Sequence, residues 1–411
     1  MICAQGGSRD SATNSNNSIR KHQMDEAALQ KKLDLKLKDF APDQDANKNW
    51  SDLSKWNPVE LKPESVPSPY IVYIIFVVLK DYSHGGRWEK VAWEIPIQYK
   101  GEAFMLSHRK FGFQIQSVDG TLEQAQLAQE AIFKIGKATS VAEDLLQPMI
   151  RSQIDLGEIT LVNDYHHLRA RYEYFRACAN EQLAEVREPK IIVDDSLTIH
   201  ENLNAKFASY NRGIKRKQRA GYYAMSMIDA YFSLLEHILV LVKPFVHLKG
   251  TESSLADFIR SNWGSKFKAI FNTGSNPSAN QIYSSLLSIK ETYRNPSAHG
   301  NFLKQGGSLY VHIPRVGAVP MHMSKSKDDI RYSFRSEQEL ADVCSILDAV
   351  DAFLESSITS FGMIYVKSGA EVAYDTQSKK KYAVSMIDKA TFEQFVDQVC
   401  REIDDNTNMD W

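Results

Sequence analysis

The chain has 411 residues, of which 43% are hydrophobic and 24% are charged, and these proportions are ordinary for a soluble globular protein. It carries 49 basic and 51 acidic residues, a formal net charge of −2, so it lacks the overall basic excess of many nucleic-acid-binding proteins. A nucleic-acid-binding function would therefore need a local basic patch. The length favours two or three domains over one.

Cysteine usage and the first residues indicate the compartment. The chain has no Cys-x-x-Cys pair, and its four cysteines are far apart, which argues against a zinc site or a disulfide framework: Cys3, Cys178, Cys344 and Cys400. The N-terminus lacks the basic flank and apolar core of a signal peptide. The longest apolar run, residues 70–79, is shorter than the about 20 residues that cross a bilayer. We expect a soluble, cytoplasmic protein with no membrane contact.

The N-terminal part predicts a disordered segment followed by a mixed module. Residues 1–23 are rich in Ser, Asn and Gly and contain few large apolar side chains, so they are predicted to be disordered. Residues 24–190 are predicted to form one module of sheet and helices. Helical patterns in this module cover residues 125–137, 141–150 and 164–186, and Thr121 is placed to cap the first of them.

An antiparallel sheet is predicted around residues 70–117. Tyr70–Leu79 is dense in β-branched and aromatic residues and is typical of a buried strand. Trp88–Ile97 and Lys110–Gln116 alternate apolar with polar residues, as half-buried strands do. The fold class predicted for the whole chain is therefore α+β.

Residues 191–411 are predicted to form a mainly helical domain. A basic run, residues 211–219, leads into a long apolar helix at Tyr222–Val242. A β-hairpin is predicted between residues 309–313 and 318–323. Further helical patterns cover residues 254–271, 281–293, 337–360 and 391–403.

The stretch Glu291–Gly300 holds an arginine and a histidine, Arg294 and His299, on either side of a proline. Pro296 has no backbone N–H and disfavours a helical conformation of Asn295, so the preceding helix is expected to end or kink there. Pro296 would then begin a following turn, with Asn295 as its N-cap. We expect Arg294 and His299 to point into one small space.

The sequence Arg294-Asn295-x-x-x-His299 resembles the signature of HEPN domains: an arginine, a polar residue, and a histidine four to six residues after the arginine. HEPN domains are helical bundles in which this signature lies on a late core helix. Their first long helix carries an aromatic and acidic pattern, which Tyr231–His237 resembles. The resemblance covers residues 200–362, and the hairpin would be an insertion into the bundle.

The resemblance implies a metal-independent endoribonuclease. In that reaction the ribose 2′-hydroxyl loses its proton and attacks the adjacent phosphate, giving a 2′,3′-cyclic phosphate and a 5′-hydroxyl. A histidine suits the proton transfer because its pKa is near 6.5, so His299 would be the acid/base. The planar fork of Arg294 could hold two phosphate oxygens. Asn295 would bind the phosphate or orient His299, or it would only cap the turn.

One arginine and one histidine are too few for complete acid–base catalysis. HEPN proteins resolve this by dimerising, so that two copies of the motif face each other across a twofold axis. An isologous interface brings identical residues together in this way. The resemblance therefore implies a homodimer formed through the HEPN-like domain.

Two other features, one on the long helix and one in the stretch before it, are candidates for supporting roles. Glu236 lies among apolar residues, so it either orients Arg294 or His299 or faces solvent on an amphipathic helix. A cluster of basic residues either contacts RNA phosphates or is a solvated stretch before the helix: Arg212, Lys215, Arg216, Lys217 and Arg219. Tyr222 and Tyr223 could stack on bases, although their spacing favours a partly buried position.

No metal or cofactor site is predicted. His166 and His167, with Asp164, do not form a metal site, because adjacent histidines point to different faces of a helix and no further ligand lies four residues on. The chain has neither a P-loop nor a dinucleotide-binding glycine pattern. We expect no cofactor.

The leading functional hypothesis is an endoribonuclease that cleaves RNA as a homodimer. By analogy with HEPN proteins it would act as an effector in bacterial antiviral defence or as a toxin of a toxin–antitoxin pair. Its N-terminal module would then sense a trigger or an inhibitor protein. The alternative is a non-catalytic HEPN-like module for binding or dimerisation, in which the N-terminal domain recognises a ligand or partner.

Overall fold

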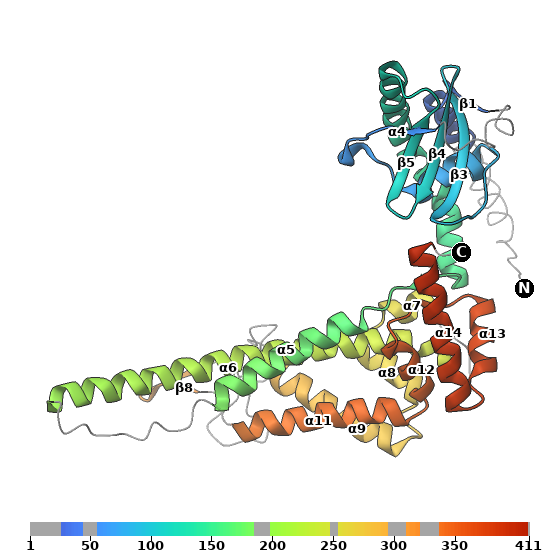
Figure 1. Ribbon diagram of the computed structural model, residues 1–411. Coiled ribbons are helices and arrows are strands. Elements are labelled where there is room, and N and C mark those ends of the chain that lie inside the picture. The colour runs from blue at the N-terminus through green and yellow to red at the C-terminus, as the bar shows by residue number, and fades with distance from the viewer. Residues whose placement is uncertain are drawn as a thin grey trace, which may run out of the picture. The chain divides into compact units, whose positions relative to one another are not determined.

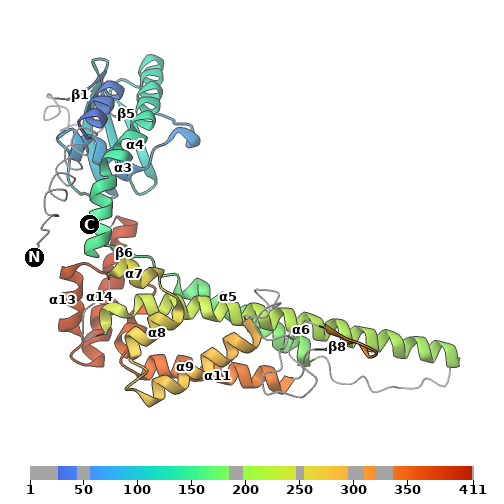
Figure 2. The same cartoon turned by 180° about the vertical axis from the view of Figure 1, so that it is seen from behind.

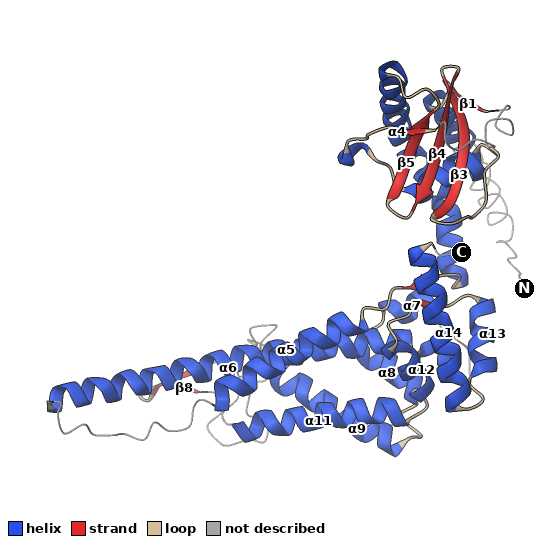
Figure 3. Cartoon of the chain, viewed as in Figure 1, coloured by secondary structure: helices blue, strands red, loops and turns tan. Residues whose placement is uncertain are grey.

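The computed structural model describes residues 26–43, 56–184, 198–246, 254–294, 310–320 and 337–409. The chain forms two compact units, one from residues 1–153 with 401–411 and the other from residues 154–400. The first combines a five-stranded sheet with helices, and the second is mainly helical, so the predicted α+β class is confirmed (Figures 1 and 3). The predicted disordered segment, residues 1–23, lies outside the described residues.

The sheet of the first unit is antiparallel. Its strand order is β1-β3-β4-β5-β2. A two-residue turn, Lys100-Gly101, joins β3 to β4, and both of its residues have positive φ (52° and 88°), as a tight hairpin turn requires. The five strands are β1 (Phe40–Pro42), β2 (Asn57–Pro58), β3 (Val91–Tyr99), β4 (Glu102–Arg109) and β5 (Gly112–Ser117). The alternating patterns therefore predicted β3 and β5 correctly.

The strand predicted at Tyr70–Leu79 is wrong. The segment forms a short helix, α3 (Pro69–Tyr73), which continues into a π-helical segment, η3 (Ile74–Leu79). Proline is favourable at the first position of a helix, and the buried side chains Ile75 and Phe76 follow Val72 by three and four residues, as on one face of a helix. A short apolar run does not distinguish a buried helix from a buried strand, which explains the error.

A long helix, α4 (Leu122–Leu156), covers one face of the sheet. The Thr121 hydroxyl accepts a hydrogen bond from the Gln124 backbone N–H (3.2 Å), which confirms the predicted cap. Two predicted helices, residues 125–137 and 141–150, form one continuous helix of 35 residues. Its small and β-branched residues share a core with Ile95, Leu106 and Ile115 of the sheet, and the helix over residues 26–36 closes that core with Leu33.

The second unit is built around α6 (Ile199–Leu241). Figures 1 and 2 show the other helices gathered along the C-terminal half of α6. They are α5 (Tyr165–Ala184), α7 (Leu255–Arg260), α8 (Trp263–Phe271), α9 (Pro277–Ile289), α11 (Glu337–Ser356), α12 (Ser360–Lys367), α13 (Thr376–Ser385) and α14 (Lys389–Asn408), of which the last ends in the first unit. The predicted hairpin is confirmed as β7 (Tyr310–Ile313) paired with β8 (Gly317–Pro320).

Helix α5 belongs with the helical unit, although the sequence placed the domain boundary near residue 190. Its core face packs against α6, and the rings of Tyr172 and Tyr231 lie 5.1 Å apart. The two helices run antiparallel, because the Asp164 backbone N–H donates to His237 at the other end (3.0 Å). The compact units therefore divide before α5, between residues 153 and 154.

Helix α6 is much longer than its partner. It has 43 residues against 20 in α5, so its N-terminal residues 199–219, which we call the arm, extend past the end of α5 (Figures 1 and 2). A capping box of Thr198 and Glu201 closes the free end. By length and composition α6 could cross a membrane, but 61% of its most apolar window is buried inside the unit, as in the core helix of a soluble protein.

Candidate functional site

Arg294 ends a helix that the sequence predicted. Helix α9 begins at Pro277 with Asn276 as its cap and buries Leu286 and Ile289. It continues without interruption into a π-helical segment, η5 (Lys290–Arg294). The buried Tyr293 donates a hydrogen bond to Glu339 of α11 (2.6 Å), which fixes this last turn against the core. Segments of π-helix are frequent at functional sites, because the extra residue re-aims the side chains that follow.

The Arg294 guanidinium is held against α6 by two contacts. Its Nε donates to Asp229 Oδ1 at 2.9 Å, and its Cζ lies 5.1 Å from the centre of the Phe232 ring. The Arg294 side chain remains 31% exposed and the Asp229 side chain 53% exposed. A planar cation that is oriented in this way but still reached by solvent can receive an anion without first being ordered.

The other two residues of the motif, Asn295 and His299, lie outside the described residues, as does Pro296 between them. The structure therefore places one of the three predicted catalytic residues. That Asn295 and His299 share a site with Arg294 stays a prediction from the sequence.

Glu236 has a structural partner of its own. Its carboxylate lies 2.5 Å from Lys266 Nζ, and Lys266 also donates to the Ser261 carbonyl. The Lys266 side chain is only 2% exposed, and a buried ammonium needs a nearby carboxylate to offset its loss of hydration. Of the two interpretations of Glu236, orientation of Arg294 does not apply, because Asp229, one heptad earlier on α6, is the carboxylate that contacts Arg294. The Glu236 carboxylate mainly stabilises the packing of α8 on α6.

Sequence reasoning missed Asp229. Two signals could have found it: Asp229 precedes Glu236 by seven residues, so both lie on one side of the helix, and Phe232 follows it by one turn. A carboxylate next to an aromatic residue on a core helix is a suitable place for an arginine from a neighbouring helix.

The basic cluster lies inside α6, in the arm, and not in a stretch that precedes the helix. Steps of three and four residues place Arg212, Lys215 and Arg219 on one side of the arm. Lys217 lies on the opposite side, because two residues turn a helix by about 200°. Arg216 is half-buried, and the other four basic residues of the cluster are exposed. The predicted cluster is therefore brought together only in part.

His237, next to Glu236, has a structural role. Its Nε2 lies 3.0 Å from the Asp164 backbone N–H at the start of α5, so the imidazole accepts that hydrogen bond. Burial lowers the pKa of His237 below its usual value near 6.5, and the nearby Asp164 carboxylate opposes that shift. The neutral form is thus the one that joins the ends of α5 and α6.

We expect this histidine to make stability depend on pH. Because the pKa of His237 is lower in the folded state, the unfolded chain binds more protons, and the unfolding free energy falls as the pH drops below about 6.5. His237→Gln removes the titration and keeps an acceptor. Urea unfolding at about pH 7.5 and 5.5 should show a smaller loss for the variant. An equal loss in both proteins would contradict this role.

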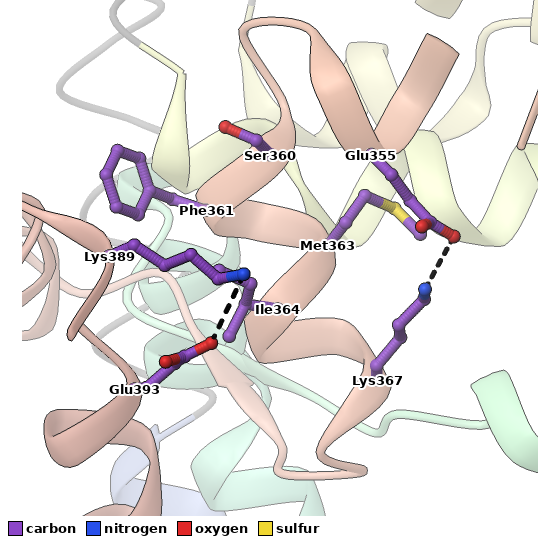
Figure 4. A pocket seen from close by; sticks show the side chains of 8 residues that line it. All are labelled: Glu355, Ser360, Phe361, Met363, Ile364, Lys367, Lys389 and Glu393. Atoms are coloured by element: carbon purple, nitrogen blue, oxygen red, sulfur yellow. Dashed lines mark hydrogen bonds and ion pairs between the residues drawn. The ribbon is translucent and has the colours of Figure 1, made fainter. Parts of the chain in front are cut away.

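A pocket of about 290 Å³ lies near the C-terminal helices and carries charges that neutralise each other. Figure 4 shows two ion pairs at its wall, Glu355 with Lys367 at 2.5 Å and Lys389 with Glu393 at 3.7 Å. It therefore offers no unbalanced charge to select a phosphate. Across the described residues no group of three or more His, Cys, Asp or Glu side chains could hold a metal ion.

Comparison of the chain with models of protein families, with curated proteins and with solved structures gives no match. The remaining indications of function are the geometry around Arg294, the side of α6 that contacts it, and the sequence motif that Arg294 begins.

Proposed function

We propose that this chain is a metal-independent endoribonuclease of the HEPN type, with His299 as acid/base and Arg294 as the residue that holds the scissile phosphate. One observation carries the proposal: Arg294 ends a π-helical turn, is oriented by Asp229 and Phe232, and is still one-third exposed. Catalysis by electrostatic stabilisation needs such a preorganised cation. The motif residues that follow it supply the proton-transfer group.

The reaction uses groups that this chain can provide. A base takes the proton of the 2′-hydroxyl, the freed oxygen bonds to phosphorus, and the 5′-oxygen leaves with a proton from an acid. Arg294 stabilises the negative charge that accumulates on the two non-bridging oxygens. Since the acid and the base are separate groups, the site is proposed to form between two copies of the chain in a homodimer.

The biological setting follows by analogy alone. The protein is proposed to act in the cytoplasm as an effector in bacterial antiviral defence or as a toxin, with RNA as its substrate. Its first unit would sense a trigger or bind an inhibitor protein. This part of the proposal rests on the resemblance of the motif and not on a contact in the structure.

The test of the proposal is cleavage of RNA by the purified full chain in the presence of EDTA. We expect fragments with 2′,3′-cyclic phosphate and 5′-hydroxyl ends, and His299→Ala should lower the rate by roughly 10² to 10⁴-fold. His167→Ala, which changes an exposed histidine of α5, is the matched control and should cleave as the wild type does. Cleavage that requires a divalent metal, or that survives His299→Ala, would refute the mechanism.

A non-catalytic binding module is the second candidate. It is favoured by the ion pair itself, because the Arg294 cation already has a carboxylate partner in Asp229. In that case Arg294 would serve to hold η5 on α6. Folded protein that binds RNA but leaves it intact in EDTA and in Mg²⁺ would support this candidate.

A further inference from the structure

The C-terminal half of α6, residues 220–241, which we call the core half, has one solvent-exposed side. Over residues 220–241, all of which the structure describes, Tyr222 and Asp229 are the only exposed residues. They are seven residues apart, so they lie about 10.5 Å apart along the axis and are turned by only about 20°. Asp229 is also the residue that holds Arg294. The exposed side therefore leads directly to the proposed site.

The same side continues into the arm and becomes basic. Lys215 precedes Tyr222 by seven residues, and Arg212 and Arg219 flank it at steps of three and four. Lys215, Arg212 and Arg219 are all exposed. From Lys215 to Asp229 the axial distance is about 21 Å. Cations, an aromatic ring and the Arg294 site thus follow one another along one straight side of a single helix.

This order of side chains matches the chemistry of a single nucleic-acid strand. Lysine and arginine neutralise successive phosphates, and an exposed aromatic ring stacks on a base. Tyr222 is 70% exposed, although its neighbours in the sequence, Gly221 and Tyr223, are buried and half-buried. An exposed ring on a core helix, between a basic cluster and a fixed arginine, is well placed to hold one base.

We infer that this side of α6 is a binding track for single-stranded RNA, which delivers a phosphate to Arg294; the inference rests on the proposed function. Phosphates contact Lys215 and Arg219, and a base stacks on Tyr222. An unpaired strand is required, because the bases of a duplex are stacked on each other and do not offer a face to Tyr222. An acidic protein would contact the same cations but would not need the ring.

The ring is tested by Tyr222→Ala in the full chain, in the His299→Ala background to prevent cleavage. Fluorescence anisotropy with a labelled single-stranded RNA should show affinity reduced by roughly 5- to 100-fold. Tyr222→Trp should keep the affinity. Tyr210→Ala is the matched control, since Tyr210 is 68% exposed on the same helix but is turned away by about 120°. Equal effects of the Tyr222→Ala and Tyr210→Ala changes would overturn the track.

The cations are tested by Lys215→Gln against Lys217→Gln. Both remove one charge from the same exposed cluster, but on opposite sides of the arm. Loss of a phosphate contact at Lys215 should reduce the slope of log affinity against log salt by about 0.7, and Lys217→Gln should leave the slope unchanged. Equal slopes for the two variants would overturn the track. So would an affinity for duplex RNA equal to that for single-stranded RNA. Displacement of the bound RNA by a polyglutamate peptide as effectively as by unlabelled RNA would overturn it as well.

Binding and cleavage are read separately, so the two proposals can fail separately. If Tyr222 and Lys215 control RNA affinity but the wild type never cleaves, the track stands and the nuclease proposal fails. If the wild type cleaves in EDTA but neither residue affects binding, the nuclease proposal stands and the track is wrong. The absence of any RNA binding would overturn both.

Discussion

Replacing Arg294 with alanine is expected to lower kcat/KM for the proposed RNA cleavage by roughly 10³-fold, a typical cost of removing a preorganised group that stabilises charge in a transition state. The side chain is held by Asp229 and lies over the Phe232 ring, so it contributes an orientation as well as a charge. The effect should fall mainly on kcat, because the charge on the phosphate oxygens grows as the reaction proceeds.

Two further variants separate charge from orientation. Arg294→Lys keeps the charge but loses the planar fork and the Nε contact with Asp229, so most of the activity should be lost. Asp229→Asn keeps an oxygen that can accept from Nε, and it should retain more activity than Arg294→Lys. Circular dichroism should show that all three variants are folded. Wild-type rates in Arg294→Ala would contradict the assignment of Arg294 to the reaction.

The largest effect on stability is expected at Asp351 in α11. Its Oδ1 accepts from the Tyr231 hydroxyl (2.8 Å) and its Oδ2 lies 2.5 Å from Arg169 of α5. Tyr231 is almost fully buried, and burial, followed by the Asp351 charge, raises its pKa. Asp351→Ala would remove this carboxylate from both groups, but the Tyr231 hydroxyl keeps the Leu347 carbonyl and Arg169 keeps Glu173. We expect a cost of about 2 to 3 kcal/mol in the free energy of unfolding.

Asp348, one turn earlier on α11, gives a matched control. It pairs with Arg176 of α5 through both carboxylate oxygens, but its side chain is 50% exposed against 18% for Asp351. Solvent screens such a pair, so Asp348→Ala should cost about 1 kcal/mol or less. Urea unfolding followed by far-ultraviolet circular dichroism measures both variants. Equal losses of stability would contradict the network around Tyr231.

Local patterns predicted the strands in which polar and apolar residues alternate along the sequence. Polar and apolar residues alternate in the sequences of β3 and β5, so both strands could be found, although Glu94 and Pro96 of β3 are buried as well. Strand β4 was not predicted, because Phe104, Met105 and Leu106 are all buried and the alternation is lost when both faces are covered. Tyr70–Leu79 failed for the related reason that a run of apolar residues has no visible period.

Local sequence patterns could not predict the contacts between helices that are far apart in the sequence. The motif identified Arg294, but its partner Asp229 lies 65 residues earlier and meets it only after α9 packs on α6. The sequence indicated that Glu236 needed a partner, yet it could not choose Lys266 among the available cations. The compact units divide before α5 and not near residue 190, because the pairing of α5 with α6 depends on their tertiary contact and not on the composition of the connection.

The arm makes the stability of α6 uneven along its length. Helices in proteins gain most of their stability from packing, but the arm extends past the end of its partner α5, and Gly213 adds a further cost of about 1 kcal/mol. The arm can remain helical because its turns propagate from the core half of α6 and its N-terminus is capped by Thr198 and Glu201. Lys215 and Tyr222 lie on either side of the point where the core half of α6 meets the arm. A strand bound there would therefore also favour helical order in the arm, and by reciprocity any change that unwinds the arm would weaken the binding.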